Sequence, residues 1–209
     1  MKILTCSVGS YLTNCYLLID EKSGEAAAVD CAVYDDDYRF FIENSGIKEL
    51  KYILLTHGHF DHVCGVKQLK ENYGGRICIH PEDAACLSDE KESLNFYSKY
   101  GVQEAVFPDE TFDEGTELYL GEEKLTVMHT PGHTKGSVCF LSDGVMLSGD
   151  TLFRCSMGRT DMPGGSTRTL FQSLRRLGQL EGDYAVYPGH GEKTSLSWEK
   201  ENNRYLRAK

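Results

Sequence analysis

Four short apolar segments of the chain each run directly into a turn that carries histidine or aspartate beside glycine. The segments and their polar residues are 52–55 with His57, His59, Asp61 and His62, 124–128 with His133, 145–148 with Asp150, and 184–187 with His190. A strand end has a backbone fixed by its sheet, and the loop that follows lets side chains converge. The sequence therefore predicts a sheet edge at which these polar side chains meet.

The rest of the pattern predicts a mixed α/β domain. Expected strands lie at 14–20, 25–30, 52–55, 76–79, 117–120, 124–128, 137–141, 145–148 and 184–187, and expected helices at 35–44, 63–72, from 81, and 167–177. Residues 22–24 read as the turn of a hairpin. No Pro/Ser/Gly-rich linker divides the 209 residues, so we expect one domain over residues 1–209.

The chemistry of these turn residues indicates a catalytic metal site. Imidazole and carboxylate ligands suit zinc, with iron or manganese as alternatives, and the absence of thiolates from the turns argues against a closed structural zinc site. Five histidines and two aspartates are too many for one tetrahedral ion, but they match two neighbouring ions that share a carboxylate. The predicted ligands are His57, His59, Asp61, His62, His133, Asp150 and His190.

Composition excludes several other classes of function. The formal net charge is −10 and no basic stripe is present, so nucleic acid is not an expected partner. No apolar stretch approaches the roughly 20 residues that span a bilayer, and the N-terminus lacks the apolar region of a secretory signal. We therefore expect a cytoplasmic protein that does not bind membranes and whose eight scattered cysteines are reduced thiols.

The motifs resemble those of the metallo-β-lactamase superfamily. Thr56-His57-Gly58-His59-Phe60-Asp61-His62 resembles its His-x-His-x-Asp-His signature, and 130–134, 149–153 and 188–191 resemble its later motifs, in order. The resemblance implies a four-layer αββα sandwich of two mixed β-sheets flanked by helices. It also implies a first metal held by His57, His59 and His133, a second held by Asp61, His62 and His190, and Asp150 bridging both.

Within that superfamily, 149–153 and 157–161 look like the glyoxalase II group, which hydrolyses hydroxyacyl thioesters of glutathione. Arg159 stands where those enzymes place a basic contact to the thiol carrier. Asp161 and Glu192 stand where the group has aromatic residues, and the chain ends 19 residues after His190. The resemblance is therefore to a short glyoxalase II-like branch, and the carrier is glutathione or another thiol.

The resemblance implies that a metal-bridging hydroxide attacks the carbonyl of a small-molecule thioester, while the catalytic carboxylates Asp61 and Asp150 orient the site and balance its charge. Three alternatives stay open. The first is a persulfide dioxygenase with a single iron, a class that resembles the chain at 158–161. The second is a lactonase or another ester hydrolase, which fits the same ligands. The third, a non-catalytic metal-binding protein, is the least expected, because all seven ligands are present. Either a monomer or a homodimer is compatible with the sequence.

Two further features have a functional and a plain interpretation. Cys155 follows Asp150 on a loop that should border the site, where it is either a substrate or redox contact or a passive thiol. Aromatic residues in the irregular 88–114 region either cover the substrate as a flap or pack on the sandwich, namely Tyr97, Tyr100, Phe107 and Phe112.

Overall fold

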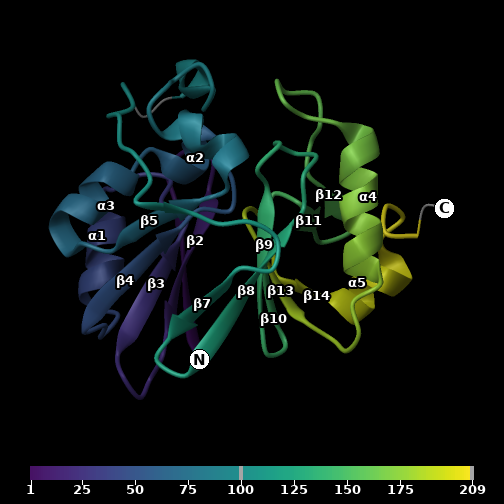
Figure 1. Cartoon of the computed structure of the whole chain (residues 1–209), viewed down its shortest axis with the longest axis horizontal. Helices are drawn as coiled ribbons and strands as arrows, with labels where there is room; N and C mark the ends of the chain where they lie inside the picture. The colour runs from purple at the N-terminus through teal and green to yellow at the C-terminus, as the bar shows by residue number, and fades with distance from the viewer. Residues whose placement is uncertain (99–100, 208–209) are drawn as a thin grey trace.

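The computed structural model describes residues 1–98 and 101–207, and two six-stranded sheets form its centre. Figure 1 shows the two sheets side by side with helices on both outer faces. The first sheet is built from residues 2–111 and the second from residues 117–195. The described residues contain no helix long and apolar enough to cross a membrane.

The first sheet has the order β1-β2-β3-β4-β5-β6. Its strands are β1 (Lys2–Val8), β2 (Thr13–Ile19), β3 (Glu25–Val29), β4 (Glu49–Leu54), β5 (Arg76–Ile79) and β6 (Glu110–Thr111). The first three strands pair antiparallel, and β3 to β6 pair parallel. The β2–β3 connection is the predicted hairpin, and Gly24 takes a positive φ of 81° in its turn.

The second sheet has the order β14-β13-β10-β9-β8-β7. Its strands are β7 (Glu117–Leu120), β8 (Glu123–His129), β9 (Val138–Ser142), β10 (Val145–Gly149), β13 (Ala185–Pro188) and β14 (Thr194–Ser195). Only β10 and β13 pair parallel, so both strands end at the same edge. A small hairpin of β11 (Leu152–Phe153) and β12 (Ser156–Met157) follows β10.

Helices cover the outer face of each sheet. The helices over the first sheet are α1 (Asp36–Glu43) and α3 (Val66–Tyr73), and those over the second are α4 (Thr167–Gly178) and α5 (Leu196–Asn202). Three short pieces lie in the connections, α2 (Phe60–Val63), η1 (Pro81–Leu87) and η2 (Asn95–Tyr97). Asp35 and Ser166 cap α1 and α4 with side-chain hydrogen bonds, which satisfies backbone N–H groups at those helix starts.

Strand alternation produces three apolar layers. In β2, Leu17 packs toward α1 and α3, whereas Leu18 packs between the sheets. In β10, Leu147 packs between the sheets, whereas Met146 packs toward α4 and α5. Both sheets are therefore covered on both faces, which confirms the predicted αββα sandwich.

Several elements differ from the sequence expectation. The helix predicted over 63–72 is divided at Cys64 and Gly65, where the N–H of Gly65 donates to the carbonyl oxygen of Cys31 at 2.9 Å instead of continuing the helix. The helical start at 81 is a 3₁₀-helix. Strands β1 and β14 and helix α5 were not predicted from the sequence. The count of one domain stays a prediction.

Candidate metal centre

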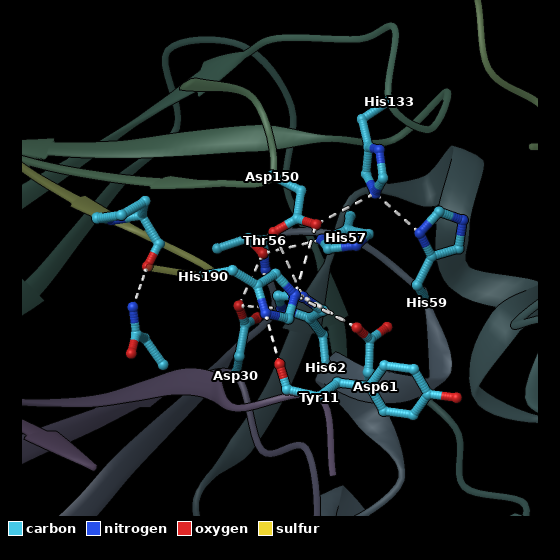
Figure 2. Close-up of polar contacts among 12 residues, drawn as sticks. Tyr11, Asp30, Thr56, His57, His59, Asp61, His62, His133, Asp150 and His190 are labelled. Carbon is cyan, nitrogen blue, oxygen red and sulfur yellow. Dashed lines mark hydrogen bonds and ion pairs between the residues drawn. The ribbon is translucent and has the colours of Figure 1, made fainter. Parts of the chain in front are cut away.

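The seven predicted polar side chains gather at one edge of the two sheets (Figure 2). His57 follows β4. His59 lies on the turn before α2, and Asp61 and His62 lie on α2. The remaining residues follow strands of the second sheet: His133 after β8, Asp150 after β10 and His190 after β13. Both sheets therefore contribute to one cluster, as the strand-end pattern predicted.

The first group of side chains consists of His57, His59 and His133. One ring nitrogen of each lies within 4.8 Å of the others, and all three residues are buried. His59 Nδ1 lies 2.9 Å from His133 Nε2. Three imidazoles converging on one point form the ligand arrangement of a catalytic zinc site.

The second group consists of Asp61, His62 and His190. His190 Nε2 lies 3.3 Å from Asp61 Oδ2 and 3.3 Å from His62 Nε2. A carboxylate and two imidazoles can hold a second divalent ion.

Asp150 lies between the two groups. Its Oδ2 is 3.6 Å from His133 Nε2 and 3.7 Å from His190 Nε2, and its Oδ1 is 3.5 Å from His62 Nε2. Gly189 packs against this carboxylate so closely that a Cβ there would lie 2.2 Å from Asp150 Oδ1. The shared position of Asp150 is the one that a bridging ligand needs.

Two buried polar atoms at the centre of the cluster, His57 Nε2 and Asp150 Oδ1, have no hydrogen-bond partner among residues 1–98 and 101–207. A buried polar atom without a partner is costly, so each such atom indicates a missing ligand. Both atoms belong to the set of nitrogen and oxygen donors that bind divalent ions. The residues present therefore fit a metal centre.

Hydrogen bonds behind the cluster fix the histidine rings. His133 Nδ1–H donates to the carbonyl oxygen of Arg159 at 2.8 Å, and His190 Nδ1–H donates to that of Tyr11 at 3.1 Å. His57 Nδ1 lies 3.1 Å from Thr56 Oγ1. These contacts leave Nε2 of each ring facing the cluster, which is how second partners orient metal-binding histidines.

Sequence reasoning missed Asp30, a buried residue at the end of β3. Its Oδ2 lies 2.8 Å from His62 Nδ1, and its carboxylate accepts hydrogen bonds from the N–H and Oγ1 of Thr56, both at 2.8 Å. Asp30 has a φ of 60°, an uncommon backbone conformation for a residue with a side chain. Asp30 stands directly after an apolar strand, which is the same sequence signal that identified the seven predicted ligands.

Burial and charge divide the histidines into two kinds. Burial and neighbouring histidines hold the pKa of His57 far below its usual range, and burial lowers the pKa of His59 to about 3. Burial opposes charge on His62 as well, but Asp30 and Asp150 outweigh it and raise the pKa of His62 to about 10. The hydrogen bond from His190 and the nearby histidines likewise outweigh burial and lower the pKa of Asp61.

Five of the seven cluster residues line a cavity of about 460 Å³, namely His59, Asp61, His133, Asp150 and His190. The walls are largely apolar, formed by Tyr11, Phe60, Leu94, Phe153, Met157 and Met162. Arg159 also lines the cavity, and its guanidinium forms a bidentate pair with Asp161, at 2.7 and 2.9 Å. Arg159 therefore borders the cavity, and its positive charge is paired with the carboxylate of Asp161.

The other singled-out residues lie around this cavity or away from it. Cys155 is exposed, while its neighbours Ser156 and Met157 line the cavity, and none of the eight cysteines forms a disulfide. Phe112 is buried between the sheets, so the flap interpretation is wrong for it. Tyr97 and Phe107 are exposed and are not among the lining residues, and Tyr100 lies outside the described residues.

Comparisons with known proteins agree with this fold. The hydroxyacylglutathione hydrolase GloC of Haemophilus influenzae is 34% identical over 221 residues, covering 100% of both chains. The solved structure of the B3 metallo-beta-lactamase BLEG-1 is similar with a TM-score of 0.91 and 27% identity, covering 99% of this chain and 100% of that chain.

A second solved structure, TTHA1623 in a di-iron-bound form, has a TM-score of 0.85 and 31% identity, covering 97% of this chain and 99% of that chain. The family model described as the metallo-beta-lactamase superfamily matches residues 8–190. That match contains every residue of the cluster, from His57 to His190. The chain is a member of the metallo-beta-lactamase superfamily.

Proposed function

We propose that this chain is a metal-dependent hydrolase of small-molecule thioesters that works with two divalent ions, preferably zinc. The observation that carries the proposal is the convergence of seven residues with nitrogen or oxygen ligand atoms beside one cavity. Two of their buried atoms, His57 Nε2 and Asp150 Oδ1, have no hydrogen-bond partner among the described residues. A concave, largely apolar pocket with a few convergent polar groups is the usual form of a small-molecule active site.

The proposed ligands fall into two sets joined by one residue. His57, His59 and His133 would hold the first ion and Asp61, His62 and His190 the second, with Asp150 shared. When bound, such ions supply a water of lowered pKa as nucleophile and polarise a carbonyl oxygen.

The chain's own groups bind and orient the substrate. The apolar wall of the cavity contacts the acyl part of a thioester and excludes water from it. Asp61 and Asp150 are the proposed catalytic carboxylates, because they face the reacting centre and offset the positive charge gathered there. Arg159 would contact the thiol carrier at the cavity wall.

The likeness to GloC supports a thioester of glutathione, since the match covers the whole of both chains. Arg159 supports an anionic carrier, because it is the one arginine or lysine among the described residues that line the cavity. Its pairing with Asp161 means that a substrate carboxylate would have to compete for the guanidinium. The carrier therefore has to be identified by a panel of substrates.

Metal content measured beside a substrate panel tests the proposal. The panel contains acyl-glutathiones, other acyl-thiols, lactones, a β-lactam and glutathione persulfide, with oxygen uptake recorded for the persulfide. We expect two ions per chain and the highest kcat/KM for a thioester. One iron per chain with oxygen uptake would identify the persulfide dioxygenase, and a preference for lactones would identify the lactonase.

Asp150→Ala separates catalysis by this cluster from a contaminating activity. Loss of the shared ligand should lower kcat by roughly three or more orders of magnitude, since preorganised electrostatic groups supply most of such rate enhancements. Asp143→Asn is the matched control, because it removes one carboxylate charge at the far end of β10. Near wild-type thioesterase activity in Asp150→Ala would contradict the assignment.

A further inference from the structure

A buried aspartate outside the seven-residue cluster connects the two loops that carry the first group of histidines. Asp83 lies on η1, after β5, and its residue is only 3% exposed. It belongs to the first half of the chain, yet its carboxylate contacts loops that follow both β4 and β8. Asp83 is not one of the seven predicted metal ligands.

Three hydrogen bonds define the contact. Asp83 Oδ2 accepts from the backbone N–H of Gly58 at 2.9 Å and from Thr134 Oγ1 at 2.6 Å. Asp83 Oδ1 accepts from the backbone N–H of Gly136 at 2.8 Å. Gly58 stands between His57 and His59, and Thr134 follows His133, so one carboxylate binds residues that adjoin all three histidines of the first group.

The backbones around Asp83 are closely packed. A Cβ at Gly136 would lie 2.6 Å from the Asp83 carboxyl carbon, and a Cβ at Gly58 would lie 2.5 Å from Cys86 Cβ. Glycine at both positions lets the two backbones approach the carboxylate directly. A charged acceptor that is buried and fully hydrogen-bonded is costly to disturb, so it fixes the distance between the loops.

We infer that Asp83 is a positioning residue for the first metal site, which it builds by holding the ligand loops of the two sheets at a fixed separation. This inference rests on the proposed metal centre. It does not extend to the second site, because that site has its own supports. Asp30 holds His62, and the carbonyl of Tyr11 holds His190.

The test measures zinc affinity one site at a time, with a competing chelator and without substrate. In a His190→Ala background, which leaves the first site, Asp83→Asn should weaken zinc binding about tenfold to a hundredfold, as loss of outer partners does. In a His59→Ala background, which leaves the second site, the same change should alter affinity less than about threefold, because the second site shares no partner with Asp83.

Asp20→Asn is the matched control for general destabilisation. Asp20 is also a buried carboxylate that accepts backbone hydrogen bonds, from Lys22 and Ser23, but it lies in the β2–β3 turn. It should leave both affinities unchanged. Thr134→Val removes one of the three contacts and replaces Asp83→Asn if that variant does not fold, with about a threefold to tenfold loss expected at the first site only.

The outcomes separate the two proposals. Equal losses at both sites, or no loss at either, would overturn the role of Asp83 while leaving the metal centre in place. Failure of the unmodified protein to bind two ions would instead overturn the proposed centre. Because no substrate is used, a wrong choice of thioester does not affect the result.

Discussion

At the scale of single residues, the unequal pKa values of the histidines determine how the cluster takes up metal. His57 and His59 have lowered pKa values, so their rings are neutral at pH 7.5 and their lone pairs are free. The pKa of His62 is raised to about 10, and that of His190 is also raised, because carboxylates surround both rings. His62 is therefore protonated until an ion arrives.

Zinc binding to the metal-free protein should release protons at pH 7.5. A base with a raised pKa holds its proton at this pH, and a metal ligand must be deprotonated, so the proton from His62 is released and affinity falls as pH is lowered. Calorimetry in buffers of different ionisation enthalpy measures the number released.

Asp30→Asn is the informative variant for this prediction. It removes the charge that keeps His62 protonated, so fewer protons should be released per chain. Zinc affinity should also fall about tenfold or more, because His62 loses the partner that orients it. An unchanged proton count in this variant would show that Asp30 does not control the ring.

At the scale of elements, the ends of β10 and β13 form the centre of the site. The two strands are parallel neighbours, so Asp150 and His190 leave the sheet together, and Gly189 lies directly beside the Asp150 carboxylate. The space at Gly189 is therefore part of the metal centre rather than a feature of the turn alone.

Gly189→Ala should give a folded protein that has lost most of its bound metal. The added Cβ would lie 2.2 Å from Asp150 Oδ1 and 2.8 Å from His62 Cε1, so both ligands must move. Gly178→Ala in α4 is the matched control, since its added Cβ would meet no described atom within 4 Å apart from its chain neighbours and the backbone of its own helix. That control should keep its metal and gain about 0.5–1 kcal/mol of stability from helix propensity. Metal analysis beside thermal unfolding measures both, and full metal retention in Gly189→Ala would contradict the expected geometry.

At the scale of the whole molecule, the sheets are held together by the apolar layer between them. Phe140 of β9 is fully buried in that layer and packs edge-to-face on Phe112, with 5.5 Å between ring centroids. The proposed metal ligands follow strands of both sheets, so the relative position of the sheets also determines the geometry of the site.

Phe140→Ala should lower the free energy of unfolding by about 3–5 kcal/mol, which is typical of a phenylalanine removed from a core. Phe40→Ala is the control, because Phe40 is 66% exposed and its loss should change stability by less than about 0.5 kcal/mol. Urea titration followed by tryptophan fluorescence measures both. Similar losses in the two variants would show that the layer between the sheets does not dominate stability.

The sequence pattern by itself determined the mixed α/β class and the set of candidate ligands, and the αββα sandwich was implied by the resemblance of the motifs. Apolar alternation identifies strands, and polar residues placed directly after strands, such as His57 and Asp150, stand out locally. Helix α5 escaped because only Leu196 and Trp198 are apolar in it, so its position depends on neighbouring elements.

Only the tertiary structure decided which residues hold the ligands in place. Asp30 and His62 are 32 positions apart, and Asp83 and Thr134 are 51 apart, so no local pattern records either contact. The same holds for Phe112, which the structure buries between the sheets. Ligand type is a property of single residues, whereas the distances between ligands depend on how two sheets pack, and that packing is set by the whole chain.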